Sequence, residues 1–227
     1  MKAIILAAGR GTRFGKITEK TPKSLIRVAG KPILERILFS LPPQIDEVVI
    51  VIGHLGGQIK KRFGDKFAGR DMKYVEMKEL TGTGSAVWLV KPLLRDRFLV
   101  LNGDDIYSKN ELGGLLKYER AAGLAKTMPQ NPSYLTFQTD KKSYITGARY
   151  PNEYEMENGI MISTGAFVLD PSIFKYKLVP IAKGREFGLP QTILKSIRKF
   201  SLKGVYMKNW AQINRPEDIK KAEKILG

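Results

Sequence analysis

The sequence contains no cysteine and only one histidine, His54, among its 227 residues. Without cysteine there are no disulfide bonds or thiolate metal sites, and a single histidine cannot form a multi-histidine metal cluster. Only oxygen atoms remain as ligands for a metal ion. No apolar run approaches the ~20 residues of a membrane-spanning helix, and Met1-Lys2 leads directly into an apolar strand rather than into a signal peptide. We therefore expect a cytoplasmic protein that does not associate with membranes.

Acidic residues are scarce relative to basic ones. The chain carries 39 Lys and Arg against 22 Asp and Glu, a formal net charge of +17, and such an excess makes nucleic acid a candidate partner. The basic residues are spread over several expected helices, at 60–62, 195–199 and 220–224, and no RNA-binding signature or dense basic tail accompanies them. We interpret the charge as a solvated surface with no specific nucleic-acid binding, and keep a nucleic-acid-binding protein as an alternative.

Short apolar runs alternate with amphipathic segments in the first half of the chain. Helical patterns occur at 33–41, 57–63 and 86–94. Strand-length runs occur at 3–6, 48–52, 73–77 and 98–101. Strands that are buried on both faces and alternate with helices predict an α/β fold with a doubly wound, mainly parallel sheet. The length and a hydrophobic content of 43% suit a single domain over residues 1–227.

The pattern changes after a helix expected at 111–122. Short strand candidates separated by polar turns follow, at 134–138, 144–149, 160–162 and 166–169. Two more helices are expected at 190–199 and 216–226, each with proline in its first turn. The second half is therefore predicted to form a small mixed lobe beside the parallel sheet.

A glycine-rich segment closes the first expected strand. Leu6-Ala7-Ala8-Gly9-Arg10-Gly11-Thr12-Arg13 is followed about one loop later by Pro22-Lys23-Ser24-Leu25. Small residues let backbone N–H groups approach a triphosphate, and Arg13 and Lys23 supply positive charge to its oxygens. A Walker A loop ending at Lys16 would need Gly at Arg10, and a dinucleotide fingerprint would need a third Gly at Phe14. We interpret the segment as an NTP site, the alternative being a turn whose glycines only meet backbone demands.

A second polar motif follows the strand expected at 98–101, where Asn102-Gly103-Asp104 stands. Ligands of doubly wound sheets collect at the carboxyl ends of strands, so this motif and the glycine-rich segment point to the same crevice.

These motifs together resemble the nucleotidylyltransferases that activate sugar 1-phosphates. Their signature is a strand, then Gly-x-Gly-Thr-Arg, then Pro-Lys-x-Leu, and the similarity extends through 82–86 and 102–104 to a looser match at 210–218. The resemblance implies a Rossmann-like nucleotidyltransferase fold, with an NTP-binding half at 1–125 and an acceptor-binding half at 126–227. It implies Mg²⁺ as cofactor and an NTP and a sugar 1-phosphate as substrates. Several relatives carry a hexapeptide-repeat acyltransferase domain after this point, and we expect none here.

The implied reaction is attack by a phosphate monoester oxygen on the α-phosphorus of the NTP, with release of pyrophosphate. A monoester phosphate has its second pKa near ~6, so the nucleophile is already anionic at neutral pH and no general base is required. The resemblance assigns the β- and γ-phosphates to Arg13, the α-phosphate to Lys23 and the metal ion to Asp104. It assigns the nucleotide to residues of the two glycine-containing segments, namely Leu6, Ala7, Ala8, Gly9, Gly11, Thr12, Arg13, Lys23, Gly82, Thr83 and Gly84. Gly82 and Gly84 also fit a simple tight turn.

The sequence departs from the family at the remaining sites. Relatives carry a second metal-binding carboxylate in a Trp-x-Asp motif, where this chain has Gln212, so Gln212 or Asn214 is the candidate second ligand. Relatives carry Glu-Lys-Pro where this chain reads Arg149-Tyr150-Pro151, and Arg149 is expected to replace the missing lysine charge. The acceptor candidates are therefore Asn102, Arg149, Thr164 and Gly165.

Those departures keep two other functions open. The acceptor of the nucleotidyl group could be another phosphorylated alcohol, for example in a CTP-dependent reaction, or the chain could be a non-catalytic nucleotide-binding homologue. The nucleobase and the oligomeric state, including a homo-oligomer, stay undetermined by the sequence. We interpret His54 as a residue that caps a helix or bonds the backbone rather than as a catalyst.

Overall fold

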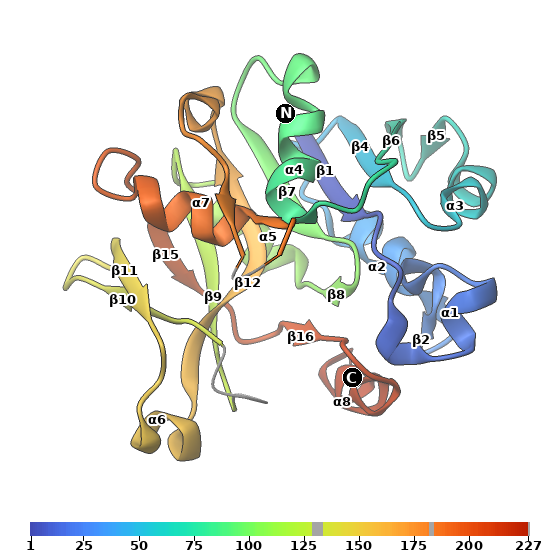
Figure 1. Cartoon of the computed structure of the whole chain (residues 1–227). Coiled ribbons are helices and arrows are strands. Elements are labelled where there is room, and N and C mark those ends of the chain that lie inside the picture. The colour runs from blue at the N-terminus through green and yellow to red at the C-terminus, as the bar shows by residue number, and fades with distance from the viewer. Residues whose placement is uncertain (129–133, 182–183, 227) are drawn as a thin grey trace.

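The computed structural model describes residues 1–128, 134–181 and 184–226, and an eight-stranded sheet forms its centre (Figure 1). Across the sheet the strands are β15 (Lys203–Tyr206), β9 (Ala121–Thr127), β12 (Ile160–Leu169), β7 (Phe98–Asn102), β1 (Lys2–Ala7), β4 (Glu47–Ile52), β6 (Arg70–Glu76) and β5 (Lys66–Phe67). The pairs β7–β1, β1–β4, β4–β6 and β15–β9 are parallel. The pairs β12–β7, β12–β9 and β5–β6 are antiparallel.

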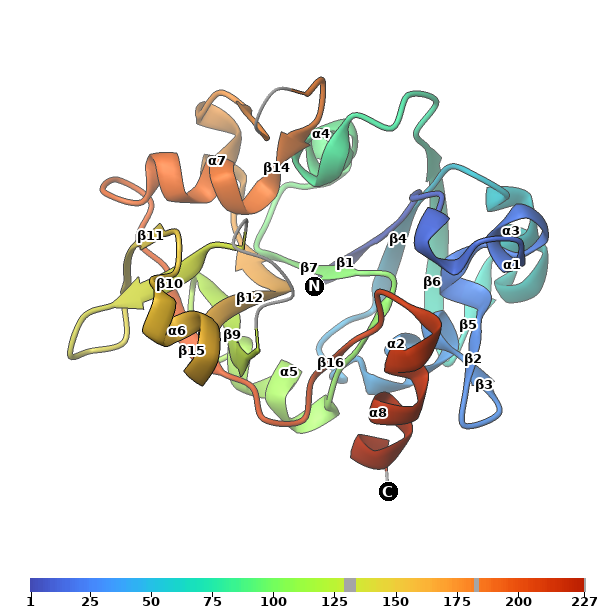
Figure 2. The same cartoon turned by 60° about the horizontal axis from the view of Figure 1, so that its bottom comes forward.

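Helices cover both faces of this sheet. On one face α2 (Ile33–Ser40), α3 (Gly56–Phe63), α5 (Lys109–Leu115) and α8 (Pro216–Leu226) contribute to a core that includes Ala3 and Ile5 of β1. On the other face α4 (Gly82–Leu89) and α7 (Leu189–Ser196) pack on a core that includes Ile4. Successive residues of a strand point to opposite faces, so the apolar residues 3–7 of β1 contribute to both cores. Figure 2 shows α8 at the end of the chain that is marked C.

Short elements complete the described chain. Two-stranded pairs are formed by β2 (Arg27–Val28) with β3 (Lys31–Pro32), β8 (Asp105–Ile106) with β16 (Ala211–Gln212), β10 (Thr136–Thr139) with β11 (Ile145–Arg149), and β13 (Val179–Pro180) with β14 (Phe187–Gly188). Short helices are α1 (Ile17–Lys20) and α6 (Glu153–Asn158), and 3-10 turns are η1 (Thr12–Phe14), η2 (Lys23–Leu25), η3 (Lys91–Leu93) and η4 (Pro171–Lys175).

The prediction of a doubly wound, mainly parallel α/β sheet is confirmed, but three element predictions were wrong. The helix expected at 111–122 ends at Leu115, and β9 begins at Ala121 as a strand of the main sheet. The separate strands expected at 160–162 and 166–169 are one strand, β12, whose pairing with β9 shifts register between Ser163 and Phe167. The helix expected at 86–94 begins at Gly82 and ends at Leu89.

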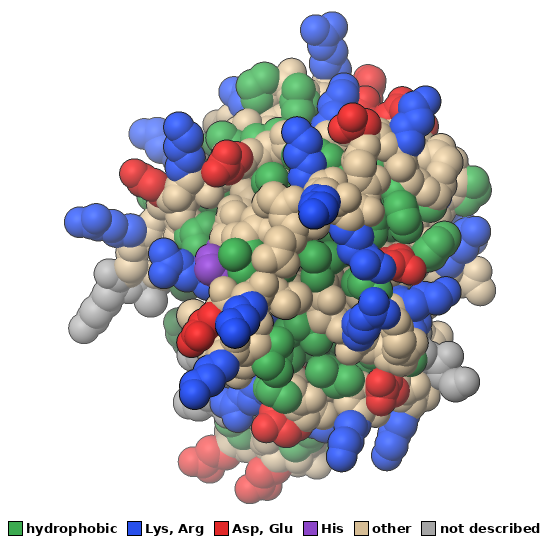
Figure 3. Space-filling view, turned by 90° about the vertical axis from the view of Figure 1, so that its right-hand side faces the viewer, with side chains coloured by type: hydrophobic (Ala, Val, Ile, Leu, Met, Phe, Trp, Pro, Cys, Tyr) green, Lys and Arg blue, Asp and Glu red, His purple; other side chains and the backbone are tan. Residues whose placement is uncertain are grey.

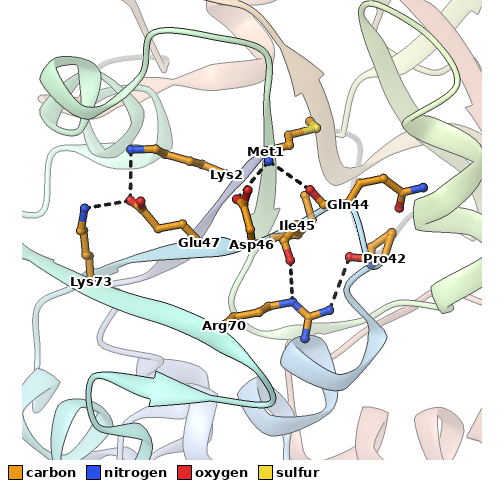
Figure 4. A network of polar contacts seen from close by, with 9 residues as sticks. All are labelled: Met1, Lys2, Pro42, Gln44, Ile45, Asp46, Glu47, Arg70 and Lys73. Atoms are coloured by element: carbon orange, nitrogen blue, oxygen red, sulfur yellow. Dashed lines mark hydrogen bonds and ion pairs between the residues drawn. The ribbon is translucent and has the colours of Figure 1, made fainter.

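A polar network ties together the amino ends of the parallel strands (Figure 4). Glu47 of β4 lies between Lys2 of β1 and Lys73 of β6, at 3.1 and 3.2 Å. The Arg70 guanidinium donates to the carbonyls of Ile45, at 3.0 Å, and Leu41, at 2.8 Å. Burial lowers the pKa of Arg70. Because these contacts lie at the opposite end of the strands from the polar motifs, we treat them as structural.

Charges of both signs share the surface. On the face drawn in Figure 3, Lys and Arg side chains are interspersed with acidic and apolar ones rather than gathered in one basic tract. No helix in the described residues has the length and apolarity needed to cross a bilayer.

Candidate active site

A cleft of about 540 Å³ opens at the carboxyl ends of β1 and β7. It is lined by Leu6, Ala7, Ala8, Gly9, Arg10, Gly11, Thr12, Arg13, Lys23, Ser24, Met77, Leu80, Gly82, Thr83, Ala86, Asn102, Gly103, Asp104, Glu186 and Asn214. Parallel pairing of β1 with β7 places the two polar motifs side by side, and the Gly103 amide donates to the Leu6 carbonyl at 2.9 Å. The cleft therefore lies where a doubly wound sheet binds ligands.

Lys23 and Asp104 form an ion pair in this cleft. The Lys23 ammonium donates to Asp104 Oδ2 at 2.5 Å, although the two residues are 81 positions apart in the chain. The Lys23 side chain is 11% exposed and that of Asp104 is 36% exposed. The ammonium also lies 5.7 Å from the centre of the Phe14 ring. The pair brings a cation from η2 and an anion from the loop after β7 to one point, which suits them to a ligand that carries phosphate and metal.

Asp105, next to Asp104, is buried. Its carboxylate accepts from Asn102 Nδ2 at 3.4 Å. Burial, and then the neighbouring Asp104 charge, raise the pKa of Asp105 well above its usual value. Asp105 belongs to β8, which pairs with β16, so we interpret it as a structural residue that joins the loop after β7 to the C-terminal segment.

The glycine-rich segment leaves β1 and turns through η1. Phe14 is buried in the core beneath η1, while Thr12 and Arg13 are exposed and line the cleft. His54 bonds the backbone, as expected: its amide donates to the Ala8 carbonyl at 3.3 Å, and its ring Nε2 lies 2.9 Å from the Thr18 carbonyl. His54 thus supports the loop from behind and does not line the cleft.

The second glycine segment begins α4 and packs against β14. Gly82 has φ +95, and a Cβ atom there would stand 2.5 Å from the Phe187 carbonyl oxygen, so only glycine fits. The Phe187 amide donates to the Thr81 carbonyl at 2.7 Å, and the Leu189 amide donates to Thr83 Oγ1 at 3.0 Å. Gly82 and Thr83 line the cleft, whereas Gly84 lies against the same segment outside it. We name this contact between 81–84 and 187–189 the α4–β14 seam.

The acceptor candidates are separated by the structure. Asn102 lines the cleft, and Gly165 packs against its side chain, since a Cβ at Gly165 would stand 2.1 Å from Asn102 Nδ2. Thr164 is fully buried, and its hydroxyl donates to Met207 Sδ at 3.3 Å. Arg149 lies outside the cleft, and its Nη1 and Nη2 donate to the Glu155 carboxylate at 2.7 and 2.8 Å.

The metal candidates differ in the same way. Asp104 and Asn214 line the cleft, whereas Gln212 does not. The Asn214 backbone N–H donates to Asp218 Oδ2 at 2.9 Å, which fixes the backbone at this position beside α8. In the described residues no three His, Cys, Asp or Glu side chains cluster. A carboxylate and an amide that share an open cleft are oxygen donors of the kind Mg²⁺ accepts, with its other positions left to water and phosphate.

Several cleft residues were not assigned from the sequence, among them Met77, Leu80, Ser24 and Glu186. Glu186 lines the cleft because the next residue, Phe187, is bonded to Thr81 in the α4–β14 seam. No local sequence pattern predicts this contact. Ser24 is buried, and its hydroxyl has no hydrogen-bond partner among the described residues. The Pro-Lys-x-Leu signature leaves this position variable, so only the fold identifies it.

Comparison with known proteins agrees with the geometry. The family model described as the MobA-like NTP transferase domain matches residues 3–123. The chain is 34% identical over 227 residues to the bifunctional protein GlmU of Methanococcus vannielii, with 96% of this chain and 53% of that protein covered. It is 29% identical over 237 residues to the UTP–glucose-1-phosphate uridylyltransferase AglF of Haloferax volcanii, with 100% of this chain and 96% of that protein covered.

A solved structure of a UDP-glucose pyrophosphorylase complexed with UDP-glucose has the same fold. The TM-score is 0.81 at 18% identity, over 99% of this chain and 97% of that one. The chain spans about half the length of the GlmU protein that it matches. The predicted Rossmann-like nucleotidyltransferase fold and the family resemblance are both confirmed.

Proposed function

The chain belongs to the MobA-like NTP transferase family, and on that premise we propose that it transfers a nucleoside monophosphate from an NTP to a sugar 1-phosphate. The products are an NDP-sugar and pyrophosphate. The observation that carries the proposal is the Lys23–Asp104 pair, at 2.5 Å, in the cleft that the glycine-rich segment also lines. AglF, which matches the chain along its whole length, is named for this chemistry with UTP and glucose 1-phosphate.

In the proposed reaction a phosphate oxygen of the acceptor forms a bond to the α-phosphorus of the NTP. The bond from the α-phosphorus to the oxygen that bridges to the β-phosphorus breaks, and pyrophosphate leaves with the electron pair. No proton moves at the attacking oxygen, because a phosphate monoester is already ionised at neutral pH. A reaction that needs no general base suits this cleft, because its described lining contains no histidine or cysteine.

Three charged side chains of the cleft, Arg13, Lys23 and Asp104, then have electrostatic roles. Lys23 neutralises charge on the α-phosphoryl group as a compact point charge, and Arg13, with a planar fork, binds the departing pyrophosphate. Asp104 and Asn214 would hold Mg²⁺, which when bound supplies positive charge to the phosphate oxygens. Asn214 rather than Gln212 is proposed here because Asn214 lines the cleft. With both substrates charged phosphates, we place the activity in the cytoplasm.

The acceptor-lobe geometry also supports a second candidate, transfer to another phosphorylated alcohol. Arg149, the expected replacement for the family's phosphate-binding lysine, is engaged by Glu155 outside the cleft. Asn102 and Glu186 also line the cleft and offer an amide and a carboxylate to hydroxyl groups of an acceptor.

The test is pyrophosphate release with each NTP against glucose, N-acetylglucosamine and inositol 1-phosphates, with Mg²⁺ and with EDTA. Metal-dependent release with a sugar 1-phosphate supports the main proposal, and release with inositol 1-phosphate alone supports the second candidate. Nucleotide binding without release from any pair, in the presence of Mg²⁺, would reject both and indicate a nucleotide-binding homologue.

A further inference from the structure

The glycine-rich segment is held from inside by one buried hydroxyl group. Thr18 is 4% exposed, and its Oγ1 lies 3.0 Å from the Gly11 carbonyl oxygen and 3.1 Å from that of Gly15. A hydroxyl carries one proton, so it donates to both carbonyls in a shared bond. Gly11 and Gly15 flank η1, which contains Arg13.

The same turn has glycine in a left-handed conformation on both sides of η1, and it is closely packed at Gly11. Gly11 and Gly15 have φ +65 and +57, values that side chains other than glycine rarely adopt. A Cβ atom at Gly11 would stand 2.9 Å from Lys23 Cβ and 3.1 Å from Thr18 Cγ2. Glycine has wide conformational freedom at both positions, so contacts such as those of Thr18 are needed to hold the turn in one conformation.

His54 holds Thr18 in turn. The His54 ring Nε2 lies 2.9 Å from the Thr18 carbonyl, and because a carbonyl only accepts, Nε2 carries the proton in this bond. We call Gly11, Gly15, Thr18 and His54 the loop brace. Of these four residues only Gly11 lines the cleft, so Thr18 and His54 can act on a ligand only through the turn that they hold, which carries Arg13.

We propose that Thr18 is a positioning residue that fixes the Arg13 turn in the conformation that binds the pyrophosphate portion of the nucleotide. The proposal rests on the proposed function. Without the Thr18 hydroxyl, nothing joins the Gly11 and Gly15 carbonyls, the two flexible glycines let the turn move, and Arg13 loses its fixed position. Misplacement of a charged group by about 1 Å can cost ~10²-fold in rate, so a single shared hydrogen bond is enough to matter.

The test uses inorganic pyrophosphate with Mg²⁺, a product common to every NTP, in calorimetric binding to the full chain. Thr18→Val should weaken binding about tenfold, the value of one hydrogen bond of ~1.4 kcal/mol, while Thr18→Ser should bind like the parent. In an Arg13→Ala background, Thr18→Val should change binding less than about twofold, because Arg13 is then absent. Thr136→Val, at another buried threonine outside the cleft, is the matched control and should bind normally.

An equal loss with and without Arg13, a loss in Thr18→Ser as large as in Thr18→Val, or normal binding by Thr18→Val would overturn the proposal. Thermal unfolding accompanies each measurement, and if Thr18→Val does not fold, Thr18→Ala is measured in its place. Turnover of the parent chain is followed separately. A parent that binds pyrophosphate but turns over no acceptor refutes the proposed function. The role of Thr18 is then still tested by the pyrophosphate affinities of the Thr18 variants with and without Arg13.

Discussion

Lys23→Ala should reduce turnover far more than it reduces stability. A cation about 4 Å from a phosphate oxygen is worth ~4 kcal/mol at an effective dielectric constant of ~20. Only the charge that develops in the transition state counts toward the rate, so the expected loss in kcat is ~10²-fold to 10³-fold. The partner left behind, Asp104, is 36% exposed and can be hydrated, so the free energy of unfolding should fall by less than about 1 kcal/mol.

The assay is steady-state pyrophosphate release at saturating NTP and acceptor, with urea unfolding of the same samples. Lys20→Ala is the matched control, because Lys20 lies in the same segment, is exposed and does not line the cleft. Its kcat should stay within about twofold of the parent, as for a typical exposed charge. A Lys23→Ala chain that retains near-normal kcat would refute the electrostatic role, and one that loses activity only by unfolding would refute the site.

Three further results are expected. Arg70→Met should lower the free energy of unfolding by about 2 kcal/mol, because it leaves backbone carbonyls unpaired, with kcat unchanged; a large loss of kcat in the folded chain would contradict this. Burial acts to raise the pKa of Asp170, but bonds from Ser172 and Arg120 outweigh it and lower that pKa. Asp170 therefore stabilises the fold above its unfolded pKa and loses this effect as pH falls through the lower folded value. Asp170→Asn should cost about 1 kcal/mol at pH 7 and less at pH 3 in urea titrations, and a pH-independent cost would count against the pair. Gly82→Ala should push β14 from α4 and lower kcat/KM at least tenfold, about the effect of ~1.4 kcal/mol. Normal kinetics would show that the α4–β14 seam can move apart without any effect on the site.

The parts of the fold that sequence could predict are those with strong local patterns. Apolar β-branched runs identified β1 and β4, and their parallel pairing follows from the helices between them. Strand β9 escaped because its residues, Ala121-Ala122-Gly123-Leu124-Ala125, are mostly small and carry no β-branched side chain. It is a strand because β12 and β15 pair with it on both sides, a non-local condition that propensity cannot express.

The site residues also divide into those that a local pattern predicts and those that depend on contacts between distant segments. Of the residues that the sequence assigned to the nucleotide, those on the glycine-rich segment line the cleft, because a short loop after a buried strand has few places to go. Arg149 does not line the cleft, because Glu155, six residues further along the chain in the N-terminal cap of α6, pairs with it. Glu186 depends on the α4–β14 seam, and the preference for Asn214 over Gln212 depends on where the chain leaves β16. Such contacts are properties of the assembled chain.

The pairing of β12 with β7 joins the region that the family model matches to the rest of the chain. Residues 98–100 of β7 share their antiparallel ladder with residues 167–169, which follow the family-matched region in sequence. A fragment cut after residue 123 would leave that side of β7 as a bare apolar edge, and bare edges recruit strands from other molecules. A chain cut at the end of the family-matched region is therefore expected to aggregate through the exposed edge of β7.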